Sequence, residues 1–230
     1  MPTSMFAIGE ICHGTPASRV GTAGLVAPWS DAYLQRMAIV VYYDFISVES
    51  FALSELLAER GLHDGIDWRG VESQRGIAAA GLDLDRRVQG RFEMELAPLV
   101  RSQPGLQVRI PKRLPNPVRA MQAVAAVARV HPRRAEEFRI RLFRELWQLG
   151  GDIADRMVIR QLAGDVGVPP FADLEHIEAQ TAQTRWQVDW ETARLGGVPR
   201  AIRPDGEILW RVDAIPDVLR FFGSGTSRTA

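Results

Sequence analysis

Two serines, Ser47 and Ser50, stand three residues apart where a buried strand is expected to end and a helix to begin, in the stretch VYYDFISVES (residues 41–50). A helix N-terminus presents unpaired backbone N–H groups and about half a positive charge, so it favours an anion. A serine hydroxyl at that point can donate one more hydrogen bond to such an anion. Serine is also a common N-cap residue, and capping requires no catalysis. Both interpretations of Ser47 are open.

Three further polar residues could act at the same point of the fold. Glu49 falls in the first turn of the expected helix, where a carboxylate complements the helix dipole but would repel a nearby anion. Asp44, at the end of the strand, is expected to be a solvated or turn-stabilising acid rather than a catalyst. Asn116, in the stretch LPNP, suits either a contact to a ligand or the turn before the next helix.

Cysteine and histidine usage limits the kinds of site that the chain can form. Cys12 is the only cysteine, so an intramolecular disulfide, a Cys-x-x-Cys redox pair and a multi-cysteine zinc site are impossible. The four histidines, His13, His63, His131 and His176, show no ligand spacing. No metal site is therefore expected.

Composition limits the class of protein. The 230 residues are 46% hydrophobic and 24% charged, which suits a folded chain with a sizeable core. The 28 Lys and Arg residues balance the 28 Asp and Glu residues, so no overall charge favours nucleic acid or an anionic membrane as a partner. No apolar run approaches the roughly 18 residues of a membrane helix. Residues 1–36 lack the pattern of a secretory signal and are rich in small residues, so we expect a cytoplasmic protein with a poorly ordered N-terminal tail.

Hydrophobic periodicity predicts an α/β protein that is interrupted by a helical block. Residues 38–45 are typical of a buried strand, residues 48–60 of an amphipathic helix and residues 66–71 of a second strand, and the two strands should pair in parallel. Three-to-four spacing of apolar residues predicts helices throughout residues 84–168. A long helix, two short strands around a turn at residues 204–206 and a closing helix complete the chain.

Two sets of side chains within the helical block can be interpreted from their spacing. Phe143 and Trp147 are four residues apart, so they share one helix face and are expected to cover the core. Arg139, Arg141 and Arg144 are expected to form a solvated face of the same helix.

Five stretches follow one another between about residues 38 and 222: YYDFISVESF, LPNPVRAMQA, LFRELWQLGGDIADRMVIRQLAGDVGV, ETARLGGVPRAI and WRVDAIPDVLRFF. In this order they resemble the DsbA-like thioredoxin superfamily, in particular the branch of 2-hydroxychromene-2-carboxylate isomerases, kappa-class glutathione transferases and related bacterial dithiol oxidoreductases. The resemblance implies an α/β, thioredoxin-like fold with a large all-helical insertion. Residues 37–82 and 171–223 would form the thioredoxin-like domain, and residues 83–170 the helical insertion.

The resemblance also assigns roles at the candidate site. In redox members of the superfamily the first helix opens with Cys-x-x-Cys, and Ser47 and Ser50 occupy those two positions here. In glutathione-dependent members the first position is a serine, which implies that Ser47 holds the thiol of bound glutathione. Val198 and Pro199 match the family's Val-Pro element, whose proline is cis and whose backbone would bind the cysteinyl residue of glutathione.

The sequence departs from the family pattern at several positions. Val48 replaces a proline that is common after the first serine, and Arg200 replaces a threonine that is common after the cis-proline. Of the Ser-Asp pair near the last helix only Asp213 is present, and it would meet the γ-glutamyl ammonium group. Because Arg200 should lie near the helix start, we hypothesise that it faces Glu49 across the cleft and offsets its charge.

Three functions follow from these expectations. The first is a glutathione-dependent isomerase or transferase, which would take a small molecule, aromatic in the isomerases, and could form a homodimer as its relatives often do. The second is an inactive DsbA-like homologue that uses the same cleft as a binding module. The third is a purely structural or interaction protein. Dithiol oxidoreductase chemistry by the usual route is excluded, because a serine cannot form a disulfide.

Overall fold

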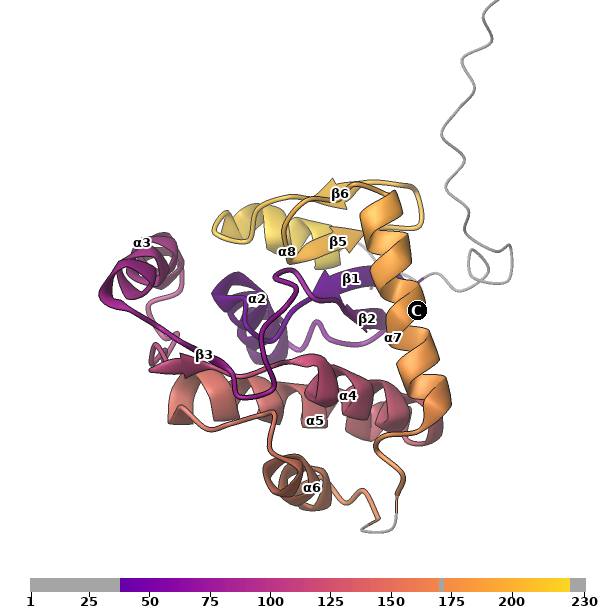
Figure 1. Ribbon diagram of the computed structural model, residues 1–230. Helices are drawn as coiled ribbons and strands as arrows, with labels where there is room; N and C mark the ends of the chain where they lie inside the picture. Colours follow the sequence, from indigo (N-terminus) through magenta and orange to yellow (C-terminus); the bar gives the residue numbers. More distant parts are fainter. Residues whose placement is uncertain (1–37, 170–171, 224–230) are drawn as a thin grey trace, which may run out of the picture.

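A four-stranded sheet lies at the centre of the computed structural model, which describes residues 38–169 and 172–223 (Figure 1). The expectations for the N-terminal tail and Cys12 lie outside these residues. The elements follow in chain order: β1 (Ile39–Tyr43), α2 (Val48–Glu59), β2 (Ile66–Gly70), β3 (Leu82–Asp83), α3 (Arg86–Ser102), β4 (Arg113–Leu114), α4 (Val118–Val130), α5 (Pro132–Arg144), the π-helical turn η1 (Glu145–Leu149), α6 (Arg156–Asp165), α7 (Ile177–Thr192), β5 (Arg200–Ile202), β6 (Ile208–Leu209) and α8 (Ile215–Gly223).

The sheet has the strand order β2-β1-β5-β6. β1 pairs in parallel with β2 and antiparallel with β5, and β5 pairs antiparallel with β6. The predicted parallel β-α-β unit is thus confirmed, with α2 as its crossover helix.

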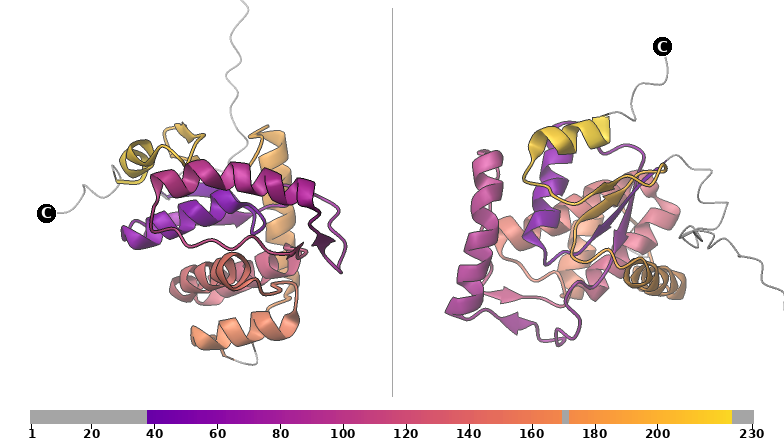
Figure 2. Two further views of the ribbon diagram at one scale, coloured as in Figure 1. Left: turned by 90° about the vertical axis from the view of Figure 1, so that its left-hand side faces the viewer. Right: turned by 90° about the horizontal axis from the view of Figure 1, so that it is seen from above.

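Alternation along β1 divides the core between the two faces of the sheet. Val41 and Tyr43 pack into the large core with α2 and the insertion, whereas Tyr42 packs with Trp186 and Trp190 of α7. Successive side chains of a strand point to opposite faces, so one continuous apolar run serves both layers. The two further views show α7 on one side of the sheet and α2 and α8 on the other (Figure 2).

The insertion packs on the sheet and on the start of α2. Trp147 is fully buried, as predicted, and its indole Nε1 donates a hydrogen bond to the carbonyl oxygen of Phe45 at 2.7 Å. Gly70 ends β2 against α4, where a Cβ would lie 2.7 Å from Cγ of Met121. The block expected to be all-helical also contains the antiparallel pair β3 and β4. Strands of two residues are too short to produce an alternation that a sequence pattern could reveal.

Arg139 corrects the prediction of a solvated arginine face on α5. The exposed fraction of Arg139 is 1%, and its guanidinium lies 3.5 Å from the ring centroid of Trp68. It donates to Oγ of Ser54 at 2.9 Å and forms an ion pair with Glu136. A buried arginine is tolerated here because its charge is paired and an aromatic face accepts it. Arg141 and Arg144 are exposed as expected, at 40% and 46% of their side-chain surface.

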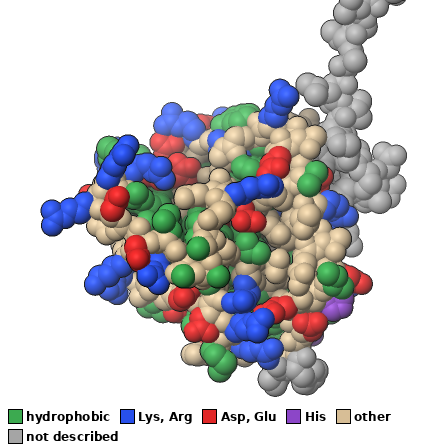
Figure 3. All heavy atoms as spheres, in the orientation of Figure 1, with side chains coloured by type: hydrophobic (Ala, Val, Ile, Leu, Met, Phe, Trp, Pro, Cys, Tyr) green, Lys and Arg blue, Asp and Glu red, His purple; other side chains and the backbone are tan. Residues whose placement is uncertain are grey.

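Basic and acidic side chains are interspersed over the face of the molecule that Figure 3 displays. Within residues 38–169 and 172–223, no helix is long and apolar enough to cross a membrane.

Arg139→Ala should lower the free energy of unfolding by about 3–5 kcal/mol, because it leaves the Glu136 carboxylate and the Ser54 hydroxyl without their buried cation. The matched control is Arg141→Ala on the same helix, which removes an exposed ion pair with Glu137 and should cost less than about 1 kcal/mol. Urea unfolding of both variants provides the measurement. Equal losses would contradict a stabilising role for the buried cation.

Candidate functional site

Ser47 is the N-cap of α2. Its backbone is extended, with φ −91° and ψ 117°, and its Oγ accepts a hydrogen bond from the backbone N–H of Ser50 at 3.1 Å. The capping interpretation of Ser47 is therefore confirmed. The same Oγ donates to the carbonyl oxygen of Val198 at 3.3 Å, which is long for a hydroxyl donor.

The Val198–Pro199 peptide bond is cis, as expected from the resemblance. Sheet pairing brings it to Ser47, because β1 runs antiparallel to β5 with Tyr42 opposite Arg200. The chain that leaves β1 toward α2 and the chain that enters β5 consequently meet at one end of the sheet. Ser47 and Val198, predicted from stretches 151 residues apart, are in direct contact.

A cavity of about 340 Å³ opens beside this contact, between the start of α2, the loop after β2 and helix α3. Its polar lining comes from both parts of the fold, and its apolar lining includes Phe92 of α3 and Leu114 of β4. The polar side chains that line it are Ser47, Glu49, Ser73, Gln74, Arg91 and Glu95. A charged and hydroxyl-lined cavity at a helix N-terminus suits a small polar ligand.

Asp44 lies beneath the cavity with no exposed surface. Its Oδ1 accepts from the N–H of Ile46 at 3.1 Å, and its Oδ2 accepts from both the N–H and the hydroxyl of Ser73 at 2.8 Å. Its own N–H reaches Oγ of Ser50 at 3.5 Å. Asp44 is thus a turn-stabilising acid, as expected, but it is buried rather than solvated. Burial raises the pKa of its carboxyl to about 6, although the hydrogen bonds from Ser73 and Ile46 oppose that shift.

The loop after β2 is held at three further atoms. Gln187 of α7 accepts from the N–H of Glu72 at 2.7 Å and donates to its carbonyl oxygen at 3.3 Å. The Asn116 side chain donates to the carbonyl oxygen of Ile77 at 2.6 Å and accepts from the N–H of Val118 at 3.0 Å. The turn interpretation of Asn116 is therefore confirmed, and Asn116 is not among the residues that line the cavity. Side chains that follow β1, precede α4 and lie on α7 thus hold this loop, which forms one wall of the cavity.

Arg200, which we expected to face Glu49 and offset its charge, acts on Glu49 through its charge but forms no ion pair with it. The Arg200 guanidinium instead donates to the carbonyl oxygens of Leu195, Pro199 and Trp210 at 3.0, 2.7 and 3.3 Å. These three carbonyls hold the guanidinium beside the turn that contains the cis peptide bond. The guanidinium also lies over the ring of Trp210. At longer range, the positive charge of Arg200 only partly opposes the rise that burial and Glu95 cause in the pKa of the Glu49 carboxyl.

Burial and three neighbouring charges together raise the pKa of the Glu49 carboxyl. Partial removal from water raises the pKa of its carboxyl, the Glu95 carboxylate raises it further, and Asp213 adds to the same effect against the opposing charge of Arg200. Asp213 itself is held by Arg211 at 3.0 and 2.7 Å, and this pairing lowers the pKa of the Asp213 carboxyl. Asp213 lies close enough to influence the site, but its oxygens already have a partner.

Sequence reasoning missed four of the cavity's polar residues. Ser73 and Gln74 lie in the loop VESQRGIAAAG, whose sequence matches no pattern, and only the fold brings them to Ser47. Arg91 and Glu95 form an i,i+4 ion pair on α3 at 3.4 Å. That spacing can be read from the sequence, but the direction in which the pair faces cannot.

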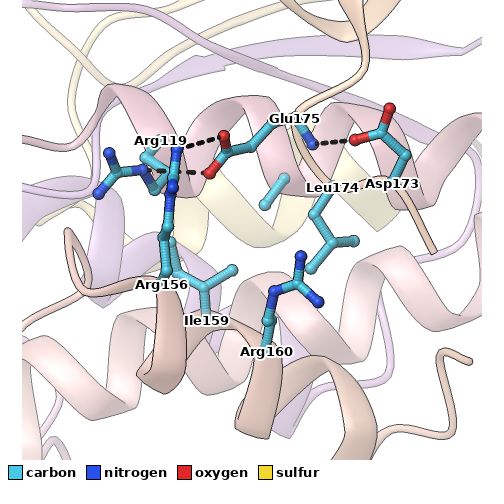
Figure 4. A pocket seen from close by; sticks show the side chains of 8 residues that line it. Arg119, Arg156, Ile159, Arg160, Asp173, Leu174 and Glu175 are labelled. Carbon is cyan, nitrogen blue, oxygen red and sulfur yellow. Dashed lines mark hydrogen bonds and ion pairs between the residues drawn. The ribbon is translucent and has the colours of Figure 1, made fainter. Parts of the chain in front are cut away.

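A second hollow of about 110 Å³ lies in the insertion, between α4, α6 and the chain before α7. Glu175 contacts both Arg119 and Arg156 there, at 3.4 and 2.7 Å (Figure 4). The Glu175 carboxylate thus already neutralises two of the cations that line this hollow. Among residues 38–169 and 172–223, no cluster of three His, Cys, Asp or Glu side chains could hold a metal ion.

Comparisons with known proteins identify the fold. No family model matches the chain, and no curated protein matches its sequence. Solved structures match at low identity over most of their length. A 2-hydroxychromene-2-carboxylate isomerase superposes with a TM-score of 0.63 and 17% identity, covering 82% of this chain and 95% of that one.

Two thiol-disulfide proteins superpose equally well. The cytosolic disulfide reductase DsbM from Pseudomonas aeruginosa, solved with GSH, has a TM-score of 0.60 and 14% identity over 82% of this chain and 98% of that one. A probable DsbA oxidoreductase from Streptomyces coelicolor has a TM-score of 0.64 and 13% identity over 84% and 92%. The chain therefore has the DsbA-like thioredoxin fold.

The stability of the protein should fall as the pH rises from about 4 to about 6, relative to an Asp44→Asn variant. Burial raises the pKa of native Asp44 to about 6, above the 3.8 of an exposed aspartate, so the native state binds the proton more tightly in this window. The difference in free energy of unfolding between wild type and Asp44→Asn should change by on the order of 3 kcal/mol between these two pH values. Urea unfolding at each pH measures this, and pH profiles that run parallel would contradict it.

Proposed function

We propose that this protein, whose fold is that of the DsbA-like thioredoxin proteins, is a glutathione-dependent isomerase or transferase with Ser47 at the thiol. One observation carries the proposal: the Ser47 hydroxyl lies at the N-terminus of α2, in contact with the residue before the cis-proline, and lines a cavity of about 340 Å³. The solved DsbM structure of the same fold contains GSH, and a 2-hydroxychromene-2-carboxylate isomerase also shares this fold.

The helix start supplies the electrostatics that a thiol-dependent reaction needs. A free thiol has a pKa of about 8.5, and the partial positive charge of a helix N-terminus favours its thiolate form. The hydroxyl of Ser47 would donate one hydrogen bond to the sulfur. Ser47 never ionises in this scheme, because the nucleophile is the sulfur of glutathione.

Binding would exchange one hydrogen bond for another at Val198. Its carbonyl oxygen now accepts from Ser47 at 3.3 Å. The cysteinyl N–H of glutathione would donate to that carbonyl, and the Ser47 hydroxyl would then be free to turn toward the sulfur. Ser50 N–H would remain bonded to Oγ of Ser47, so the serine keeps its position as the cap.

The reaction supported by this site is addition to an electron-poor double bond. The thiolate would add to the alkene, and the resulting single bond could rotate before the thiolate leaves again. A transferase would retain the sulfur–carbon bond instead. The second substrate would be a small molecule, and the apolar surfaces of Phe92 and Leu114 suit an aromatic one. The proposed location is the cytoplasm, where glutathione is kept reduced.

A second candidate function is a binding module without turnover. Both partners of the Ser47 hydroxyl are already protein groups, the N–H of Ser50 and the carbonyl oxygen of Val198, which favours a purely structural serine. Such a protein would bind a peptide or small molecule in the cavity but would not accelerate its reaction.

Reduced glutathione at millimolar concentration should raise the melting temperature by an amount that grows with concentration, as ligand linkage requires. Ser47→Ala should shrink this shift, because it removes the hydrogen bond to the sulfur. Differential scanning fluorimetry measures both, with oxidised glutathione as a second ligand. Ser102→Ala, at the far end of α3, is the control and should retain the full shift. A melting temperature that reduced glutathione leaves unchanged would refute the proposed function.

A further inference from the structure

A glutathione thiol that enters the site must give its proton to some acceptor. Among the described residues that line the cavity, Glu49 and Glu95 are the only carboxylates, and none is a histidine. The hydroxyls of Ser47 and Ser73 are too weakly basic to accept the proton. The choice of acceptor therefore lies between the two glutamates.

The two carboxylates differ in their partners and in their distance along the chain from Ser47. Glu95 comes from α3 and is paired with Arg91 at 3.4 Å. Glu49 forms no ion pair in the described part of the chain and lies two residues after Ser47, in the first turn of the same helix. Glu49 is an exposed residue that lines the same cavity as Ser47.

We propose that Glu49 is the proton acceptor for the thiol at this site, an inference that rests on the proposed function. The thiol proton passes to a carboxylate oxygen of Glu49 as the sulfur lone pair forms a bond to the β-carbon of an electron-poor alkene. The π electrons of that alkene move to its conjugated carbonyl as an enolate. After rotation about the new single bond, the enolate re-forms the double bond and expels the thiolate. Glu49 then returns the proton to the sulfur.

This proton transfer removes the electrostatic objection to a carboxylate beside the thiolate. A thiolate and an ionised Glu49 would repel one another at the helix start. When Glu49 takes the proton, the sulfur and the carboxyl group never carry two negative charges together. The single charge moves to the enolate when the sulfur–carbon bond forms, and the helix N-terminus stabilises it while it lies on the sulfur.

The charges that face Glu49 adjust its basicity in the required direction. Removal from water, Glu95 of α3 and Asp213 before α8 raise the pKa of its carboxyl, whereas Arg200 of β5 lowers it. Arg91 of α3 also lines the cavity, but it is paired with Glu95. An acid–base group is most effective when its pKa approaches the working pH, so a raised pKa makes Glu49 a better acceptor than an ordinary glutamate.

The test compares the rate at which glutathione adds to benzylideneacetone, an electron-poor aromatic enone, with and without protein between pH 5 and pH 8. Glu49→Gln should reduce the protein-dependent rate by about 100-fold, as expected for loss of a general base. The wild-type rate should fall toward low pH as Glu49 becomes protonated, and Glu49→Gln should abolish this fall. Glu95→Gln should move that fall to lower pH, because it removes a negative neighbour. Glu59→Gln, in the last turn of α2, is the matched control and should react as wild type does.

The direction in which Glu49→Gln changes the addition rate decides whether Glu49 accepts the proton or only repels the thiolate. If Glu49 only repels the thiolate, its removal will leave the rate unchanged or increase it, and the inference is then wrong. The proposed function would survive that result, provided that glutathione still raises the melting temperature and that Ser47→Ala still slows the addition. A wild-type protein that neither binds glutathione nor accelerates the addition would overturn both.

Discussion

The buried Asp44 carboxylate is the interaction on which the site depends. It joins the end of β1, the turn into α2 and the loop after β2, through the N–H of Ile46 and the N–H and hydroxyl of Ser73. Burying a carboxylate is costly, and these three donors offset that cost only when all three segments are in place. The position of the α2 N-terminus relative to the cavity wall is therefore set by one side chain.

The helical insertion completes the site rather than merely covering it. Its contributions are α3, which carries Arg91 and Glu95 to the cavity, and Trp147, whose indole binds the carbonyl oxygen of Phe45 just before the site. The thioredoxin-like part supplies the helix start and the cis-proline, both of which are set by the sheet. The thioredoxin-like part thus provides the N-terminus of α2, which favours an anion. The insertion provides the polar side chains of α3 that line the cavity beside it.

Sequence patterns identified the elements well because their signals are local. The short, β-branched apolar run of residues 38–45 predicted β1, and the resemblance assigned Ser47 and Val198 to one site, where the structure has them in contact. The interactions that patterns missed are non-local. In the sequence, nothing distinguishes Arg139 from Arg141 and Arg144, which lie in the same helix and carry the same charge. Only its position over Trp68 in the folded protein makes Arg139 a core residue. Arg200 likewise offered a plausible partner for Glu49, but three backbone carbonyls compete for its guanidinium.

The hydrogen bond between Ser47 and Val198 pairs two polar groups of the site with each other. A molecule that enters must break a bond that the protein has already formed, so it gains little unless it replaces both halves of that bond. It needs a donor for the Val198 carbonyl and an acceptor for the Ser47 hydroxyl, separated by the span of one residue. An extended cysteine-like residue has this arrangement, whereas an isolated thiol or a simple carboxylate does not. If the proposed function holds, the site would select its ligand by this exchange of hydrogen-bond partners, in addition to any contacts with the rest of the cavity.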